Sequence, residues 1–434
     1  MHLVISQKTF RETALAVFFL LSFSILKFFP SLAIITEVWI AFIFIFLVSI
    51  YIADRVATGL RITKIEGYIL ILIILVPIIS AIQSHGEFGQ PLTYGLLTQR
   101  GIVLTASAII LMHLLRHNRI TLHDIEQALV KLAWVCLATF TLITLILDPN
   151  QFVDLGNAFV TKGKGGGAVY KFNLAFVVFG LFYYLFKGFW QHNTKQLLLA
   201  MPFAFYLIFV GGGRSLLLSI FCALLFFLYR WSSIGRLVKI APRVLPILVV
   251  LLVITLIFKQ EYIVGLAMKF GDAFTVILTG EETADASANA RITETLIAKP
   301  YINKHWAFGS GNLSHQWNGG YAARFEYFYP SDIGIIGAVF SFGIVGVMLF
   351  CFQFLFAIRY ANRLPKNGGE HGALVSAVKG FLLYYALHSL VTGKFAHSVE
   401  MGMLFIAILY WAALTANNNS ASKVNNILPK GALK

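Results

Sequence analysis

Two arginines lie where a guanidinium could bind a phosphate group. Arg214 follows three consecutive glycines and opens an apolar run, and Arg291 lies in the polar segment SANARITETLIAKP. Glycines let a ligand approach the backbone closely, and a guanidinium presents a fork of N–H donors that matches phosphate oxygens. Both positions therefore predict an anion site. Alternatively, Arg214 could anchor a helix end at the membrane surface, and Arg291 could pair with Glu294 on a short helix.

The segment 314–332, SHQWNGGYAARFEYFYPSD, combines aromatic, amide and charged side chains. His315 is a candidate general base near neutral pH, with Glu326 and Asp332 as the carboxylate alternatives. Asp332 could instead cap the helix that follows it. The aromatic side chains could stack on sugars or form an interfacial belt, and we favour a carbohydrate site. The residues expected to bind substrate here are Trp317, Tyr321, Arg324 and Tyr327.

The sequence gives no sign of a metal or cofactor site. The segment Gly309-Ser310-Gly311-Asn312 resembles part of a phosphate-binding loop, but no predicted strand precedes it, so a turn is the better interpretation. No spacing of His, Cys or Asp is typical of a metal site. The three cysteines fall within apolar runs, where loop disulfides do not form. We therefore expect neither a metal nor a cofactor.

The elements that must position these residues are membrane helices. Of the 434 residues, 58% are hydrophobic and 12% are charged, and the mean hydropathy is +0.79, as in polytopic membrane proteins. Many apolar runs are long enough to cross a hydrocarbon core about 30 Å thick. We predict an all-α polytopic membrane protein with about twelve transmembrane helices. They are expected at 13–29, 32–52, 66–82, 101–115, 126–147, 172–187, 196–210, 215–229, 244–258, 333–358, 373–390 and 401–416.

Lys and Arg in the short connecting segments predict the orientation, because these residues are retained on the cytoplasmic side. With the N-terminus inside, both ends of the chain are cytoplasmic and residues 259–332 form one large, partly helical loop in the periplasm. Residues 1–258 then hold the first nine helices, and residues 333–434 hold the last three and a cytoplasmic tail. Long ordered loops often carry function, so we expect the active site to face the periplasm from a bacterial inner membrane.

The predicted outer face is itself basic, although the positive-inside rule would leave it poor in Lys and Arg. An acidic ligand is expected there, either lipid headgroups or a diphosphate-linked substrate, and we expect no nucleic acid partner. Acidic residues are nearly absent from the predicted spans, which disfavours an ion-coupled carrier. Further basic residues expected to bind substrate are Arg100, Lys162, Lys164 and Lys171.

Three blocks, in this order, resemble the O-antigen ligase and Wzy-type polymerase superfamily. They are Gly213-Arg214-Ser215; Arg291 with Ala298-Lys299-Pro300 and Phe308-Gly309-Ser310-Gly311-Asn312; and Asp332-Ile333-Gly334-Ile335-Ile336-Gly337 with Phe342-Gly343-Ile344-Val345-Gly346. The resemblance implies an inner-membrane glycosyltransferase that moves a glycan from undecaprenyl diphosphate without metal or nucleotide sugar. It also implies that Arg214 and Arg291 hold the diphosphate and stabilise it as it leaves.

Two departures from the ligase pattern favour a polymerase of O-antigen or exopolysaccharide repeat units. Thr295 stands where ligases often carry a Trp, and Tyr329-Pro330-Ser331-Asp332 stands where they carry a His-Asn pair. A ligase acting on lipid A-core remains the alternative, and a non-enzymatic flippase or exporter is the second. The implied partners are the lipid-linked glycan, the bilayer, a chain-length regulator and a separate flippase.

Overall fold

The computed structural model describes residues 7–28, 32–59, 62–155, 160–162, 168–191, 193–211, 213–231, 286–325, 328–365 and 371–427, and a few single positions between 232 and 285. The described chain is almost entirely helical. Its one pair of strands, β1 (Val160–Lys162) and β2 (Ala168–Tyr170), is antiparallel. The all-α class predicted from the apolar runs is therefore confirmed.

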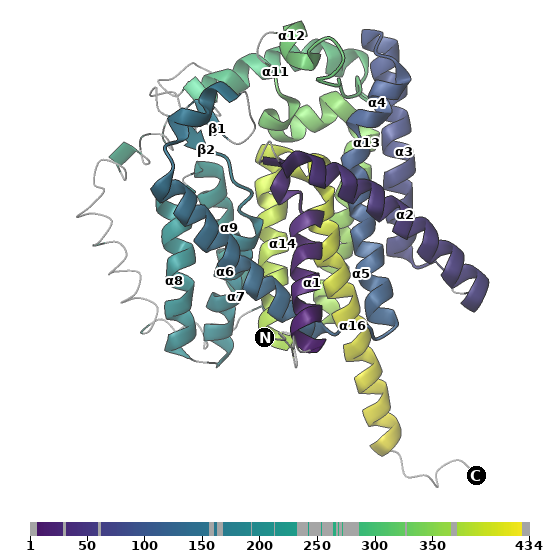
Figure 1. The fold of residues 1–434 in the computed structure, drawn as a ribbon, viewed down its shortest axis with the longest axis vertical. Coiled ribbons are helices and arrows are strands. Elements are labelled where there is room, and N and C mark those ends of the chain that lie inside the picture. The colour runs from purple at the N-terminus through teal and green to yellow at the C-terminus, as the bar shows by residue number, and fades with distance from the viewer. Residues whose placement is uncertain are drawn as a thin grey trace, which may run out of the picture.

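The long helices form one bundle in which most run side by side (Figure 1). They are α1 (Gln7–Ser22), α2 (Ala33–Thr58), α3 (Lys64–Phe88), α5 (Ser107–Arg116), α6 (Leu122–Ile146), α7 (Ala175–Gln191), α8 (Thr194–Phe209), α9 (Arg214–Trp231), α13 (Gly334–Arg363), α14 (Gly372–Thr392) and α16 (Val399–Ile427). Of these, α2 runs obliquely and extends beyond the others (Figure 1). At one end lie α4 (Leu92–Thr98), α11 (Ala286–Lys304), α12 (Gly320–Phe325) and the strand pair, and we call this the loop end. The start of α1 and the end of α16 lie at the opposite end (Figure 1).

Shorter elements connect the bundle. They are the 3-10 helices η1 (Ile25–Phe28), η3 (Arg100–Ala106), η4 (Pro149–Leu155) and η5 (Pro330–Ile333), and the four-residue helix α15 (Lys394–His397) between α14 and α16. The two that matter most for the site are η5 and α15, which lead into α13 and α16.

Fewer helices meet the requirements of a membrane span than the sequence predicted. In the described chain, seven are long and apolar enough, or eight if the pair Leu92–Thr98 and Arg100–Arg116, bent by 42°, is one span. The helices α1, α7 and α8 have 16, 17 and 16 residues, which at about 1.5 Å per residue fall short of a core about 30 Å thick. The predicted span 244–258 lies outside the described residues. A polytopic membrane protein is thus supported, but twelve spans are not confirmed.

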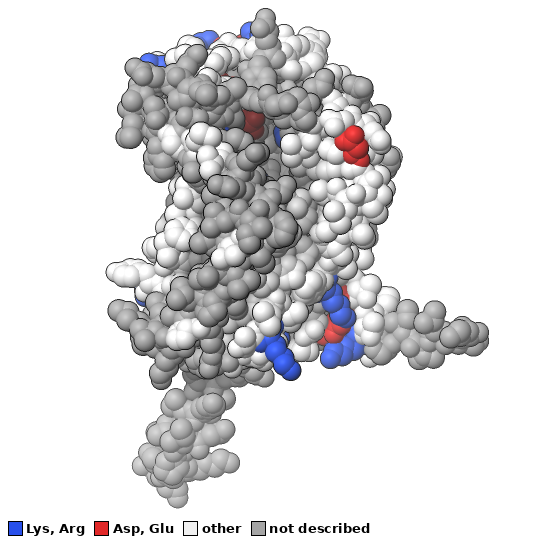
Figure 2. All heavy atoms as spheres, turned by 90° about the vertical axis from the view of Figure 1, so that its left-hand side faces the viewer, with Lys and Arg blue, Asp and Glu red and all other residues white. Residues whose placement is uncertain are grey.

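Burial and charge agree with a bundle in a membrane. The apolar windows of α14 and α16 are each 72% buried, so these helices form the centre, whereas that of α2 is 22% buried and lies at the periphery. In Figure 2, described Lys, Arg, Asp and Glu gather toward the two ends, and the described surface between them is nearly free of charge. An uncharged surface of this kind suits the hydrocarbon core of a membrane, because burying a charged side chain there is costly.

Helix α13 is broken at Gly343, whose φ of 64° and ψ of −177° are not helical. Residues 306–311 run into the break and complete its hydrogen bonding. Their N–H groups at 310 and 311 donate to the carbonyls of Phe340 and Ser341 at 2.7 and 3.0 Å, and their carbonyls at 306 and 307 accept from 344 and 345 at 2.9 and 3.0 Å. Backbone groups inside a membrane must be satisfied internally. The Gly-Ser-Gly-Asn turn thus packs into the break in α13 and supplies hydrogen-bond partners for its backbone.

Two glycines at the start of α13 bring η5 against the end of α14. A Cβ on Gly337 would lie 1.7 Å from the Pro330 carbonyl oxygen, and one on Gly334 would lie 2.2 Å from the Leu390 carbonyl oxygen. Gly334 also has a φ of +57°, which other residues rarely adopt. The Asp-Ile-Gly-Ile-Ile-Gly block therefore allows a close contact that sets residues 331 and 332 beside the turn between α14 and α16.

Candidate functional site

A cavity of about 590 Å³ at the loop end gathers residues from β2, α9, α11, η5, α14 and α15. Among its described lining residues, three carry a positive charge and one a negative charge, so we call it the cationic cavity. Figure 2, which looks toward the β1, β2 and α8 side, shows acidic and basic atoms set back in a recess near this end. The acidic, basic and histidine residues of its lining are Lys171, Arg291, Asp332, His388, Lys394 and His397.

Arg291 lines this cavity because α11 lies across the loop end (Figure 1) and is fixed there by its neighbour Glu294. The Glu294 side chain is only 1% exposed, and its Oε1 accepts a hydrogen bond of 3.0 Å from the N–H of Tyr329. Glu294 therefore ties α11 to the segment that leads into α13. The exposed guanidinium of Arg291 is left on the cavity side of α11.

Replacing Glu294 tests this tie. We expect Glu294→Ala to lower the free energy of unfolding by about 1–3 kcal/mol, because the N–H of Tyr329 loses its buried acceptor. Glu294→Gln keeps an acceptor oxygen and is expected to lose much less. Thermal unfolding of the purified protein in detergent measures both. Equal melting temperatures for the wild type and Glu294→Ala would show that the bond does not hold α11.

Arg214 borders the cationic cavity as the first residue of α9. Its neighbours Gly213 and Ser215 line the cavity, whereas Arg214 itself is half-buried and does not. The first turn of α9 still faces the cavity, where the Ser215 backbone hydrogen-bonds to His388. The positive end of a helix dipole attracts anions. The glycine turn and the helix start thus contribute to the site through the backbone.

The turn between α14 and α16 supplies two groups that the sequence reasoning assigned no role. Lys394 and His397 both line the cationic cavity, as does the buried His388 one turn before the end of α14. The signal was present in VTGKFAHSVE, where a lysine and four other polar residues interrupt two apolar runs. Gly393, with a φ of +61°, ends α14 and starts this turn.

Burial lowers the pKa of Lys394 to about 8 from its ordinary 10.5. The charged ammonium, which binds anions, is therefore lost as the pH rises through about 8. We expect the affinity for inorganic diphosphate to fall about five- to tenfold between about pH 7 and about pH 9. Calorimetry checks this, with Lys394→Arg as the matched control, because arginine stays charged over this range. A wild-type affinity that does not change with pH would contradict it.

The predicted bases are placed differently from one another. Asp332 lines the cationic cavity, with its carboxylate 3.4 Å from the Ser331 hydroxyl. His315 lies outside both described cavities, and its Nδ1 is 3.0 Å from the carbonyl oxygen of Gly319. Glu326 falls outside the described residues. Of the two described candidates, Asp332 is the one that shares a cavity with Arg291.

The aromatic segment forms a small core at the loop end. Trp317, Tyr321 and Phe325 pack around a buried group that includes Phe328 and Phe340. The Tyr321 hydroxyl donates to the Gly311 carbonyl at 2.8 Å, and burial raises its pKa. The Arg324 guanidinium lies 5.0 Å from the centre of the Phe88 ring. These contacts hold residues 317–325 against the end of α3. Sugar binding by Trp317 and Tyr321 stays a prediction.

The remaining predicted substrate ligands separate into two groups. Lys171 lines the cationic cavity from the end of the strand pair. Lys162 belongs to β1, but its side chain is outside the described part of the structure, as are Lys164 and Tyr327. Arg100 does not line the cationic cavity. Its Nε and Nη2 donate to the two carboxylate oxygens of Glu37 at 2.6 and 2.7 Å.

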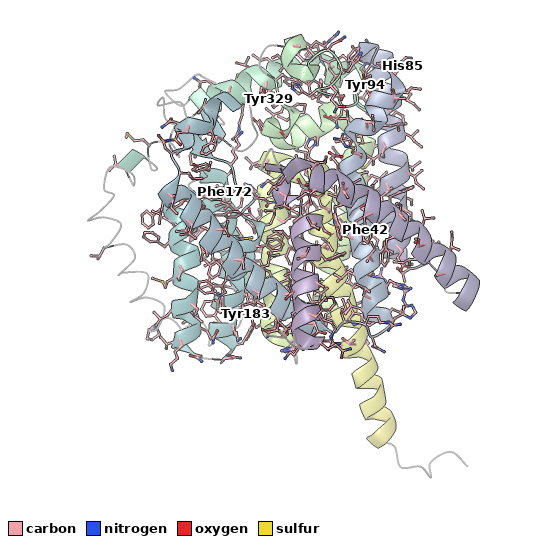
Figure 3. All side chains as sticks on the ribbon, in the orientation of Figure 1. Phe42, His85, Tyr94, Phe172, Tyr183 and Tyr329 are labelled. Atoms are coloured by element: carbon pink, nitrogen blue, oxygen red, sulfur yellow. The ribbon has the colours of Figure 1, made fainter. Side chains whose placement is uncertain are left out.

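Arg100 and Glu37 line a second cavity of about 390 Å³, formed by the start of α2, η3, residues 312–313, 321 and 329–331, and the turn before α16. The two cavities share Ser331 and His397 and therefore meet. In Figure 3, Tyr329 of the second cavity and Phe172 of the cationic cavity lie toward the loop end, and Tyr183 lies toward the opposite end. Two adjoining cavities can hold two reactants side by side.

No group of three His, Cys, Asp or Glu side chains suited to a metal ion occurs among the described residues. Lysine and arginine side chains such as Lys394 and Arg291 bind anions, and histidine and aspartate side chains such as His397 and Asp332 transfer protons. Comparison of the chain with protein-family models and with curated proteins gave no match.

Proposed function

We propose that this chain is a membrane glycosyltransferase whose donor glycan is linked to a polyprenyl diphosphate, with the diphosphate bound in the cationic cavity. The observation that carries this is the convergence of Arg291, Lys394 and Lys171 with the start of α9 in one cavity at the end of an apolar bundle. A polyprenyl chain would stay in the bilayer beside the bundle, while its diphosphate reaches charges that pure lipid does not supply.

The chemistry follows from where charge develops. When the acceptor hydroxyl attacks the anomeric carbon, the bond from that carbon to the diphosphate oxygen breaks and negative charge gathers on the leaving diphosphate. Cations and helix N–H groups fixed beside that oxygen lower the barrier. Arg291 and Lys394 are the side chains placed for this, and the turn at Arg214 supports them. A base near Asp332 must take the proton of the hydroxyl.

The acceptor is proposed to be a second lipid-linked repeat unit, which makes the protein a polymerase of O-antigen or exopolysaccharide at the periplasmic face. The support is the sequence before α13, where Tyr329-Pro330-Ser331-Asp332 stands in place of the His-Asn pair often found in ligases. A ligase transferring the glycan to lipid A-core is the second candidate, because it would use the same donor site.

Reconstitution of the purified protein with lipid-linked repeat units, without nucleotide or metal, tests the proposal. A polymerase produces a ladder of products on a gel, and a ligase produces a single transfer only when lipid A-core is supplied. An exporter instead moves the repeat unit across the vesicle membrane without lengthening it. If a well-folded protein leaves the repeat units unreacted both with and without lipid A-core, the proposal is overturned.

A further inference from the structure

His397 stands at the junction of the two cavities, because it lines both of them. It is exposed and is the last residue of α15. Its backbone N–H donates to the Gly393 carbonyl at 3.1 Å, and its ring centre lies 5.8 Å from that of Phe342. A Cβ added to Gly393 would lie 3.1 Å from Cδ2 of the His397 ring, so the glycine leaves room for the imidazole. The ring is thus packed on two sides and accessible to the cavities.

The second cavity differs in chemistry from the cationic one. Its arginine, Arg100, is neutralised by the two-point ion pair with Glu37. Thr36 lines it with a hydroxyl that is buried and finds no hydrogen-bond partner among the described residues. Tyr329 contributes an aromatic side chain that is 46% exposed. A neutral group rich in hydroxyls satisfies such a lining better than an anion does.

We infer that the second cavity holds the acceptor sugar and that His397 is the general base that deprotonates its attacking hydroxyl. The inference rests on the proposed function. The hydroxyl oxygen forms a bond to the anomeric carbon of the donor, the bond to the diphosphate breaks, and the electron pair leaves with the diphosphate. The proton passes to the imidazole of His397, and from there to the leaving diphosphate or to water.

The other described bases are less suitably placed for this step. His388 is buried in α14 and lines only the cationic cavity, as does Asp332. Glu37 is engaged by Arg100, Glu400 is buried, and both carboxylates line only the second cavity. Among the bases that the structure describes, His397 is the side chain that faces both the site of the leaving group and the site of the acceptor.

The test is a single transfer from a long-chain lipid-linked donor to a fluorescent short-chain lipid-linked repeat unit. We expect His397→Gln to lower kcat about 10²- to 10⁴-fold while donor binding is retained. Free imidazole should restore part of the rate of His397→Ala. His123→Gln is the matched control, since this exposed histidine at the start of α6 lies away from both cavities, and it should keep the wild-type rate.

A second variant tests the cavity independently of the base. Thr36→Val removes only the hydroxyl, and we expect the KM for the acceptor to rise about three- to tenfold with kcat and donor binding unchanged. Wild-type rates in His397→Gln, or an unchanged acceptor KM in Thr36→Val, would overturn this inference while leaving the proposed function in place. A wild-type protein that transfers no glycan would overturn both.

Discussion

Arg291→Ala is expected to lower the rate of glycan transfer about 10²- to 10³-fold, the usual effect of removing a group that stabilises charge in a transition state. Arg291 is exposed and lines the cationic cavity, while the packing of α11 depends on the buried Glu294 and Ala298. The variant should therefore fold normally and lose activity. Single-turnover transfer from a lipid-linked donor measures the loss, and thermal unfolding confirms the fold.

Two controls make the Arg291 prediction specific. Arg291→Lys keeps the charge but loses the planar fork of donors, so an intermediate rate is expected. Arg359→Ala removes an exposed arginine of α13 that lines neither described cavity, and it should leave the rate unchanged. If Arg291→Ala transfers glycan as fast as Arg359→Ala does, the diphosphate is not bound where we place it.

Gly343→Ala is expected to cost about 3–5 kcal/mol of folding free energy, combining backbone strain with a steric clash. The φ of 64° and ψ of −177° at this position belong to a region that is almost exclusive to glycine. A Cβ there would lie 2.3 Å from the carbonyl carbon and oxygen of Ala307. The variant must therefore expel residues 306–311 from the break in α13 or close the break itself. Low yield and a strongly lowered melting temperature should result.

Gly86→Ala is the matched control for this change. Gly86 lies in the helix α3, and a Cβ there would meet nothing within 4 Å. Alanine is favoured over glycine in a helix by about 1 kcal/mol, so this variant should be as stable as the wild type or slightly more stable. Equal melting temperatures for the Gly343→Ala and Gly86→Ala proteins would show that the position of residues 306–311 does not require the break in α13.

The class of the fold was predictable because apolar runs mark membrane helices, but the number of spans was not, since α1, α7 and α8 are too short to meet the requirement. The break at Gly343 was also not predictable, since it depends on hydrogen bonds between residues thirty or more positions apart in the chain. The aromatic segment was interpreted as a ligand surface because its composition is polar and aromatic. In the structure, that segment packs with Phe328 and Phe340 against α3. Tertiary contacts, which the sequence does not reveal, distinguish a buried aromatic core from a ligand surface.

The candidate site was predictable in part. Arg291, Asp332 and Lys171 were singled out by residue type in polar segments, and they share one cavity. Arg100 was chosen on the same grounds, but it pairs with Glu37 from a distant helix. Lys394 and His397 received no role because their short turn resembles any connection between two spans. Their importance follows from the close packing of η5 against the end of α14.

A structure of the protein with undecaprenyl diphosphate bound in a lipid nanodisc tests the central claim most directly. We expect the two phosphates to lie in the cationic cavity, within hydrogen-bond distance of Arg291 and Lys394 and facing the first turn of α9. Phosphate density outside this cavity, for example among the basic residues at the opposite end of the bundle, would contradict it.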